Sequence, residues 1–562
     1  MLSPSLRIVA AFSLLFFREA SAGSIQKDGL QVPQEYVQYR ETVKQMFLDG
    51  YGVYNSMLSV KMRSTQWLMT TFVAPFTASK PSLREPPWRV GCHHRRLDVY
   101  NAHYGSSDLY AEGLDHVKNT DFSKSDGIVS LFETTIRYIG GMLSSYELNG
   151  KKDQALVDAA RVLGDKLAFA WVDSNVLPYN SVNFRNNSAM PNSAGPAEAG
   201  TLILEWGRLS EHTGNDTYLR LTDKAFRALA TLTDTLLPAL PGGSLNAENA
   251  APVDSHITWG GGTDSYLEYL IKYARLSNNA DMLWVNTWKT AVDSSLAHLA
   301  QRTETKNWLM LADMNQGGKL SSFGSHLACF TGGNWIMGGK LIGNDTILQA
   351  GLELTDACMN TYTSTAWRFK GDDSAGQLHP LDPQDDPSSF EKEHGFSIGT
   401  ATYQLRPEVL ESNFYAWRAT GETKYLDNAV AAINAFQKYL KVESGGYAVL
   451  QDVNHPENGI IDNTPSFFFA ETLKYLYLTF DDPTRWSLDE VVFNTEAHPF
   501  LAPSALASYN EHPDAVNVPS GSGSGTKATQ SPGTPQPTNA ASQSTSAGSF
   551  FVAFGLFAFL LC

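Results

Sequence analysis

Several features that mark other protein classes are scarce in this sequence of 562 residues. Basic residues are in the minority, with 42 Lys and Arg against 58 Asp and Glu, and the formal net charge is −16. This balance argues against a nucleic-acid partner, because phosphate binding needs a basic surface. Charged residues make up only 18% of the chain and hydrophobic residues 43%, which indicates a protein with a core and excludes an intrinsically disordered one.

Long apolar runs are also scarce, and the N-terminal one is short. Residues 8–17 are largely apolar and are followed by Ala20-Ser-Ala22, small residues of the kind that precede a signal-peptidase cleavage site. Ten residues are too few to span a bilayer. We therefore predict a signal peptide at residues 1–22, with an uncleaved anchor as the alternative.

The C-terminal apolar run has a different context. Residues 501–539 form a predicted stalk, rich in Ser, Thr, Gly and Pro from Pro519 onward, which cannot bury a core. Largely apolar residues 550–562 end the chain, and a tail of this kind after small residues and a polar spacer is typical of a GPI-attachment signal. We predict attachment at Asn539 and removal of residues 540–562, with a tail-anchored helix as the alternative. The two ends together predict the secretory pathway and an extracellular or cell-surface location, held to the membrane by a lipid anchor or transferred to the cell wall.

Cysteine is scarce as well, with four residues, of which Cys562 lies in the removed tail. In an oxidising compartment Cys329 and Cys358 are the natural pair, and such a disulfide contributes about 2–4 kcal/mol of stability. Cys92 is then an odd thiol. Three Asn-X-Ser/Thr sequons predict N-glycosylation at Asn186, Asn215 and Asn344.

Between its two ends the chain contains a recurring unit. Apolar-periodic helices end in Gly or Asn, residues suited to a left-handed C-terminal cap, and an amphipathic helix soon follows each. The caps are Gly150, Gly214, Asn278, Gly343 and Gly421, spaced 64, 64, 65 and 78 residues apart. This period, without a convincing series of strands, predicts stacked helical hairpins. Residues 31–500 have room for roughly seven, which favours one closed toroidal domain over an open solenoid.

Several acids lie within these otherwise apolar helices, where burial is costly unless the acid is paired or functional. They are Glu133, Asp264, Glu268, Glu408, Glu411 and Glu471. Arg137 lies four residues after Glu133, three glycines precede Asp264, and Pro407 suits the first position of the helix that carries Glu408. Each acid alone is compatible with a surface charge or a structural ion pair. Gathered with aromatic residues in one pocket, they have the chemistry of glycoside hydrolysis, in which an acid protonates the leaving oxygen and a base activates water.

Five ordered segments carry a family resemblance. They are Phe132-Glu-Thr-Thr-Ile-Arg137, Thr263-Asp-Ser-Tyr266, His326-Leu-Ala-Cys-Phe330, Arg406-Pro-Glu408 and Val492-Phe-Asn-Thr-Glu-Ala-His-Pro499. They resemble the signature segments of class I α-1,2-mannosidases, glycoside hydrolase family 47, over about residues 121–500. The resemblance implies an all-α (α/α)7 barrel, Ca²⁺ dependence, and inverting hydrolysis of terminal α-1,2-linked mannose from high-mannose N-glycans. We expect a monomer.

The resemblance also implies roles for single residues. Glu408 is the expected general base, and Glu133 is the expected general acid through a bridging water, with Asp264 as the other candidate acid. In an inverting enzyme the acid and base carboxyls are about 6.5–9.5 Å apart. Thr495 is the expected calcium ligand, through its carbonyl and hydroxyl oxygens, with waters in the remaining positions. The expected residues that hold these waters or line the pocket are Arg137, Glu198, Glu268, His326, Arg406, Glu411, Phe467, Glu471 and Glu496. The Cys329–Cys358 pair matches the disulfide of the family.

Two places depart from a family pattern. Gly262 stands where the endoplasmic-reticulum subtype carries an arginine that restricts branch choice; a glycine resembles the fungal secreted and Golgi-type enzymes and predicts trimming of several α-1,2 linkages. Residues 51–107 lack the family pattern and contain many basic residues. They indicate a shifted reading frame or a misplaced intron boundary, with divergence that lost the first helical hairpin as the alternative.

Two other functions compete with the enzyme. One is a catalytically weak or inactive mannose-binding lectin of the glycoprotein quality-control type on the same barrel, and the other is an open-solenoid scaffold. The acids implied by the resemblance are all present, which favours an enzyme over a lectin. The combination of glycines and acids argues against a scaffold.

Overall fold

Helical hairpins dominate the structure, a computed structural model that describes residues 23–61, 107–365 and 387–510. The five predicted cap residues, Gly150, Gly214, Asn278, Gly343 and Gly421, all have φ angles between 52° and 70°. This is the left-handed region that terminates a helix while satisfying its last carbonyls. The predicted helix ends are confirmed.

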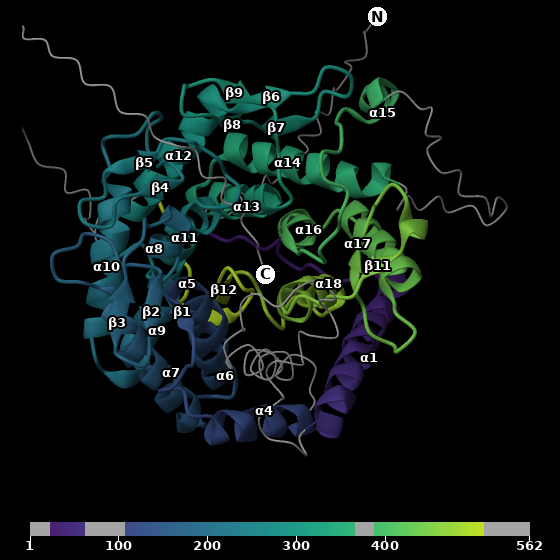
Figure 1. The fold of residues 1–562 in the computed structure, drawn as a ribbon. Helices are drawn as coiled ribbons and strands as arrows, with labels where there is room; N and C mark the ends of the chain where they lie inside the picture. The colour runs from purple at the N-terminus through teal and green to yellow at the C-terminus, as the bar shows by residue number, and fades with distance from the viewer. Residues whose placement is uncertain (1–22, 62–106, 366–386, 511–562) are drawn as a thin grey trace, which may run out of the picture. The chain divides into compact units, whose positions relative to one another are not determined.

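Each of these turns joins an inner helix to the outer helix that packs beside it, and the pairs follow one another around a ring (Figure 1). The pairs are α6 (Gly140–Leu148) with α7 (Gln154–Leu167), α9 (Ile203–Thr213) with α10 (Thr217–Ala230), α11 (Asp264–Leu276) with α12 (Leu283–His298), α13 (Phe330–Ile342) with α14 (Asp345–Ser364), and α16 (Glu408–Thr420) with α17 (Lys424–Ala435). A sixth inner helix, α18 (Leu473–Phe480), packs on α1 (Val37–Lys61), and α4 (Ser107–Asn119) lies beside α7. The all-α barrel architecture agrees with the prediction.

Inner and outer helices differ in burial as their sequences predict. The inner helix α13 buries 12 of its 13 residues, whereas the outer helix α10 buries 5 of its 14 along one face. A helix that is apolar all round is enclosed by others, and an amphipathic one covers a surface. Close packing between the layers depends on small residues: a Cβ added at Gly338 of α13 would lie 2.1 Å from the Trp288 ring of α12.

The connections at the two ends of the inner helices have different lengths. Short turns follow the inner helices, whereas long connections precede them and hold small antiparallel sheets. The sheets are β1 (Ile128–Ser130) with β2 (Ser181–Asn183) and β3 (Ser188–Met190), β4 (Ser244–Leu245) with β5 (Pro252–Asp254), β6 (Ala300–Arg302) with β7 (Leu309–Leu311), β8 (Asp313–Met314) with β9 (Leu320–Ser321), β10 (Val449–Leu450) with β11 (Ile460–Ile461), and β12 (Val491–Phe493) with β13 (Pro499–Leu501). The β12–β13 hairpin lies among the inner helices, against α6 and α11 (Figure 1).

Two inner helices begin with a π-helical segment, a feature frequent at functional sites. These segments are η2 (Thr135–Ile139), before α6, and η7 (Phe468–Thr472), before α18. The remaining short helices are η1 (Gln34–Tyr36), α5 (Leu131–Thr134), η3 (Ala168–Ala170), α8 (Pro196–Gly200), η4 (Leu327–Cys329), α15 (Pro387–His394), η5 (Phe436–Leu440) and η6 (Pro456–Asn458).

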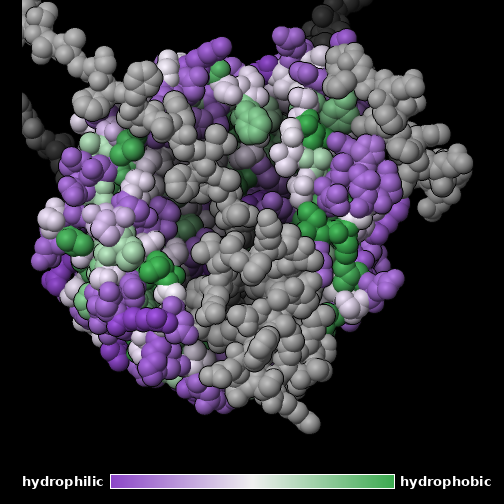
Figure 2. Space-filling view, in the orientation of Figure 1, coloured by the Kyte–Doolittle hydropathy of each residue, from purple (hydrophilic) through white to green (hydrophobic). Residues whose placement is uncertain are grey.

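Cys329 and Cys358 form the predicted disulfide, with their Cα atoms 5.9 Å apart, between the start of α13 and the middle of α14. All described residues fall within one compact unit, Met1–Pro513, and hydrophilic residues predominate around its outer rim (Figure 2).

Several predictions concern residues outside the described ranges. The signal peptide, Cys92, most of the atypical segment, residues 511–539 of the stalk, the Asn539 attachment site and residues 540–562 all lie there. Within the described residues, none of the helices combines the length and the apolar character needed to cross a membrane.

Candidate active site

The predicted acids lie at the starts of successive inner helices, the end of the ring where the long connections lie. Glu133 is in the first turn of α5, Glu198 in that of α8, and Asp264 and Glu408 are the first residues of α11 and α16. Carboxylates are stabilised there by the partial positive charge of the helix N-terminus. The helix of Glu408 begins one residue later than predicted, because Pro407 is its N-cap and not its first helical residue.

Glu133 and Arg137 form the ion pair that their spacing predicts. Arg137 Nε donates to Glu133 Oε2, and Arg137 Nη1 donates to Glu496 Oε1 at 3.3 Å and to Ser466 Oγ at 3.2 Å. The Glu496 side chain is only 3% exposed, whereas that of Glu133 is 42% exposed. One arginine thus joins a buried carboxylate on the β12–β13 hairpin to an accessible one on α5.

Glu198 is fixed from two sides. Its Oε2 accepts a hydrogen bond from the backbone N–H of Gly195 at 3.1 Å, which closes the first turn of α8, and its Oε1 accepts one from Asn180 Nδ2 at 2.6 Å. Burial raises the pKa of Glu198 despite these hydrogen bonds, and the charge of Glu133 adds to the effect. Glu133 and Glu198 therefore belong to one electrostatic cluster.

The glycines before Asp264 form a tight turn into α11. Gly262 has φ +105°, and the Asp264 backbone N–H donates to the Gly260 carbonyl at 3.1 Å. Burial raises the pKa of Asp264 to about 7, and the charges of Glu268 and Glu408 act in the same direction. A carboxyl in this environment holds its proton near neutral pH.

Glu408 has the opposite environment. Its Oε2 accepts from His326 Nδ1 at 2.6 Å, and the His326 ring is oriented in turn by Tyr362, whose hydroxyl lies 2.8 Å from Nε2. Arg406 lies 3.9 Å from Glu408 Oε1, with its guanidinium over the Phe467 ring at 5.4 Å. Burial by itself opposes ionisation of Glu408, but the hydrogen bond and charge of His326, together with Arg406, lower its pKa below the usual value. The pKa of Glu408 is thus lowered, which favours the ionised carboxylate, whereas that of Asp264 is raised, which favours the protonated acid.

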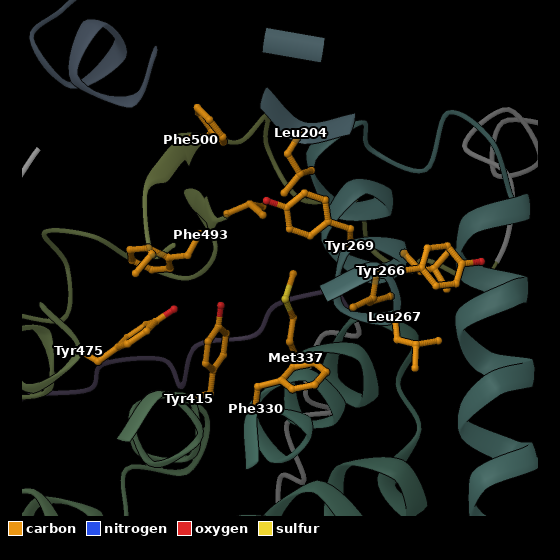
Figure 3. Packing of buried hydrophobic residues seen from close by; sticks show 14 of the residues in the cluster. Leu204, Tyr266, Leu267, Tyr269, Phe330, Met337, Tyr415, Tyr475, Phe493 and Phe500 are labelled. Carbon is orange, nitrogen blue, oxygen red and sulfur yellow. The ribbon is translucent and has the colours of Figure 1, made fainter. Parts of the chain in front are cut away.

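Glu268 and Glu411 meet around a buried lysine that sequence reasoning missed. Lys272 Nζ donates to Glu268 Oε1 and lies 3.9 Å from Glu411 Oε1, which also accepts from Tyr475 at 3.1 Å. Burial raises the pKa of Glu411 to about 8, although Lys272 opposes the shift. Figure 3 shows Tyr415 and Tyr475 near each other in this cluster, and the charge of Glu471 also reaches Tyr475. The position of Lys272, four residues after Glu268, was the available signal.

Thr495 lies in the turn between β12 and β13, and residues from several inner helices hold this turn. Its backbone N–H donates to Tyr269 Oη at 3.2 Å, and Tyr269 donates to Glu205 Oε1 at 2.6 Å. Asn494 Nδ2 also donates to Glu205 Oε1, at 2.7 Å. Burial raises the pKa of Glu205 to about 7. Glu205 is an acid in an apolar helix, like those that sequence reasoning selected, and it was overlooked.

The oxygen atoms around Thr495 and the neighbouring carboxyl groups are the candidate ligands of a metal ion. Among the described residues, no three His, Cys, Asp or Glu side chains lie close enough to hold an ion directly. A site built from Thr495 oxygens and water molecules does not need such a group, and hard oxygen donors suit Ca²⁺. Burial raises the pKa values of Asp264, Glu205 and Glu411, and this excess of buried carboxyl groups is what a bound cation would offset. The residues fit a cation.

The predicted sequons differ in their surroundings. Asn186 and Asn215 are exposed, whereas Asn344 is half-buried and caps α14 by accepting from the Ile347 backbone N–H at 3.1 Å. That hydrogen bond uses Oδ1 and leaves Nδ2, the atom that carries a glycan, uninvolved in the cap. Glycosylation at the three sites stays a prediction.

Comparisons with known proteins agree with this geometry. Mannosyl-oligosaccharide α-1,2-mannosidase 1B of Aspergillus oryzae is 39% identical over 417 residues, which cover 70% of this chain and 81% of that protein. The mannosyl-oligosaccharide α-1,2-mannosidase of Penicillium citrinum is 37% identical over 420 residues, 70% of this chain and 81% of that protein. The structure of an α-1,2-mannosidase from Trichoderma reesei matches with a TM-score of 0.71 and 28% identity, covering 83% of this chain and 99% of that one.

The family model for glycosyl hydrolase family 47 matches residues 103–502. The match begins near the end of the atypical segment and includes every predicted catalytic and metal-binding residue. Family membership is consistent with a metal cofactor, and it makes the protein a glycoside hydrolase. The chain belongs to glycosyl hydrolase family 47.

Proposed function

We propose that this protein is a calcium-dependent, inverting exo-α-1,2-mannosidase that trims terminal mannose from high-mannose N-glycans. The printed names of its relatives support the linkage and the sugar. The observation that carries the mechanism is the opposite electrostatic environment of two acids: Asp264 has a raised pKa and Glu408 a lowered one. Acid and base roles are assigned by such a separation of pKa values.

Glu408 acts as the general base. His326 occupies its Oε2, so Oε1 remains to take a proton from the attacking water. The hydrogen bond from His326 fixes the carboxylate and keeps it charged, while Tyr362 holds the imidazole ring. The proton that Glu408 takes from the water must leave to solvent before the next cycle, and the low pKa of Glu408 favours its departure.

Asp264 acts as the general acid. With its pKa raised to about 7, it carries a proton near neutral pH and can give it to the departing glycosidic oxygen. Glu133 is the alternative acid, acting through a bridging water; it is accessible but engaged by Arg137. The inverting course predicts that the two reacting carboxyls leave room for the attacking water between them.

Calcium would be held by the carbonyl and hydroxyl oxygens of Thr495 and by waters on the surrounding carboxylates. Bound there, the ion would supply coordination to sugar hydroxyls and offset the buried negative charge. Glu268, Glu411, Glu471 and Glu496 are buried, so they provide fixed acceptors for these waters. Arg137, His326, Arg406 and Phe467 line the pocket and orient the sugar.

Trimming of several linkages is proposed from Gly262. Its backbone has φ +105°, and a Cβ added there would meet only the Gly243 carbonyl oxygen, at 3.8 Å. The connection before α11 therefore presents open space where a long side chain would restrict the glycan branch. We further propose a monomer that enters the secretory pathway by the predicted signal peptide and is held at the cell surface by the predicted lipid anchor.

The test is release of free mannose from an α-1,2-linked mannobiose and from a high-mannose glycan. Proton NMR of the first anomer released should show β-mannose, because inversion changes the configuration of the α linkage. A chelator should abolish release, and added Ca²⁺ should restore it. A protein that binds the glycan and never releases mannose would be a lectin, and release of α-mannose would contradict the inverting mechanism.

A further inference from the structure

The turn that carries Thr495 is held by a chain of buried hydrogen bonds that no catalytic step uses. Thr495 N–H donates to Tyr269 Oη at 3.2 Å, and Tyr269 donates to Glu205 Oε1 at 2.6 Å. Tyr269 belongs to α11 and Glu205 to α9, and both are 0% exposed. Helix α11 therefore contacts Thr495 directly through Tyr269, and α9 holds Tyr269 in place through Glu205 Oε1.

Asn494 ties the other side of the turn to that carboxyl oxygen. Its Nδ2 donates to Glu205 Oε1 at 2.7 Å and to the Ile136 carbonyl at 3.0 Å. Its Oδ1 accepts from the backbone N–H groups of Glu496 at 3.0 Å and His498 at 2.7 Å. The Asn494 side chain thus fixes the backbone on both sides of Thr495.

The neighbouring helices pack closely around this network. A Cβ added at Gly140 of α6 would lie 2.7 Å from Asn494 Nδ2 and 3.5 Å from Glu205 Cγ. Lys474 Nζ of α18 donates to the Ala497 carbonyl at 2.6 Å. The turn is therefore contacted from α6, α9, α11 and α18.

We propose that Glu205 and Tyr269 are positioning residues that preorganise the oxygens of Thr495 for the cation. The inference rests on the proposed calcium site at Thr495. The Thr495 hydroxyl and carbonyl can converge on one ion only when its backbone is fixed, and the hydrogen bond to Tyr269 fixes it. Groups that orient a metal ligand change metal affinity by about 10–100-fold when they are removed.

The same helix offers a matched control. Tyr266 lies one turn before Tyr269 and is also 0% exposed, but its hydroxyl makes no hydrogen bond. Figure 3 shows the Tyr269 ring extending toward Phe493 of the hairpin and the Tyr266 ring extending to the opposite side of the helix. Tyr266→Phe and Tyr269→Phe each remove one buried hydroxyl from the same core. Only the hydroxyl of Tyr269 contacts the turn.

The experiment measures Ca²⁺ affinity in the full-length protein after removal of metal by a chelator. Isothermal titration calorimetry and the calcium-dependent rise of the thermal unfolding midpoint both report it without reference to activity. Tyr269→Phe should weaken Ca²⁺ binding by at least about tenfold, and saturating calcium should recover much of the lost turnover. Tyr266→Phe should bind as the wild type does.

Changes at Glu205 give a second, independent measurement. Glu205→Gln keeps an oxygen that can accept from Tyr269 and Asn494, and should bind Ca²⁺ nearly as the wild type does; Glu205→Leu has no acceptor and should match Tyr269→Phe. Wild-type affinity in Tyr269→Phe, or equal losses in Tyr266→Phe, would overturn the positioning role alone. A wild-type protein that releases mannose but shows no calcium response would overturn the cation site and this inference, while leaving the hydrolase activity intact.

Discussion

The two ends of the inner helices carry opposite chemistry. At the starts of these helices lie the carboxyl groups of Glu133, Glu198, Asp264 and Glu408. At their ends lie left-handed caps and buried arginines. Both arrangements suit the helix dipole, which favours negative charge at the N-terminus and positive charge at the C-terminus.

The buried arginines join the helix ends to segments near the two termini of the folded part. Arg275 donates to the carbonyls of Asp489 and Pro503 at 2.6 and 2.8 Å. Arg418 donates to Pro483 O, Leu478 O and Gln26 Oε1, each within 2.9 Å. One end of the ring thus gathers the proposed reacting groups, and the other joins the helix ends to the terminal segments. Substitutions at the two ends should therefore affect different properties.

The largest expected effect is at the carboxylate end. Glu408→Gln removes the base but keeps the size of the side chain, so kcat should fall by about 10²–10⁴-fold while the unfolding midpoint changes little. Mannose release and thermal unfolding of the same preparation measure the two properties. Glu304→Gln, at an exposed position, is the control and should leave both unchanged. Retention of full activity in Glu408→Gln would remove the residue from the mechanism.

At the arginine end the expected effect is on stability. Arg418→Met leaves the carbonyls of Pro483 and Leu478 buried without a donor, and the free energy of unfolding should fall by roughly 3–5 kcal/mol. Arg220→Met is the control, because the side chains of Arg220 and its partner Asp216 are 67% and 75% exposed and an exposed ion pair contributes at most about 1 kcal/mol. Calorimetry of both variants at equal protein concentration measures their losses of unfolding free energy. Similar losses in both variants would contradict the special role of the buried end.

The pH dependence of activity distinguishes the two acids at the carboxylate end. Asp264 must be protonated to act, so kcat should fall as pH rises through about 7. Glu408 must be ionised, and its lowered pKa keeps it so until the pH falls below the usual carboxyl range. Asp264→Asn should remove the alkaline limb from the residual activity. An alkaline limb that persists in Asp264→Asn and disappears in Glu133→Gln would transfer the acid role to Glu133.

The stability of the metal-free protein should respond to the same proton. The folded-state pKa of Asp264 is raised above its unfolded value, so protonation favours the folded state and its contribution is lost as pH rises through about 7. Asp264→Asn should therefore stabilise the metal-free protein more at pH 8 than at pH 5. Thermal unfolding at both pH values measures this, and an equal effect at both would contradict the raised pKa.

The smallest expected effect separates two glycines of α9. Gly214 has φ +70° with no atom within 4 Å of an added Cβ, so Gly214→Ala should cost about 1–2 kcal/mol from backbone conformation alone. Gly207 lies within the helix, where an added Cβ meets Leu219 at an ordinary 3.7 Å. Gly207→Ala should stabilise the protein by about 0.5–1 kcal/mol. A lowered unfolding midpoint in Gly214→Ala and a raised one in Gly207→Ala would confirm that only the helix end needs glycine.

Prediction from sequence succeeded where a property is local. Gly214 and Asn278 could be identified as caps because a left-handed residue is needed wherever a helix ends in a tight turn. Asp264 and Glu133 were selected because an acid in an apolar helix needs a partner or a function, and their catalytic roles stay predictions. The short sheets in the long connections were not predicted, because their strands contain only two or three residues and carry no clear alternation.

Prediction failed where several elements meet. Lys272 and Glu205 carried local signals, but Asn494 contributes through contacts with Glu205 and Ile136 that no pattern along the chain indicates. Tyr266 and Tyr269 illustrate this: they are identical in type and burial, yet only Tyr269 reaches the Thr495 turn.

The amino-acid sequence by itself determined the helical hairpins and their caps, because these depend on spacing along one chain. Only the tertiary structure decided the charge states. Asp264 and Glu408 both begin inner helices, and His326 and Arg406 beside Glu408 lower its pKa while burial raises that of Asp264. The physical reason is that ionisation depends on solvent and on charges brought from elsewhere in the fold.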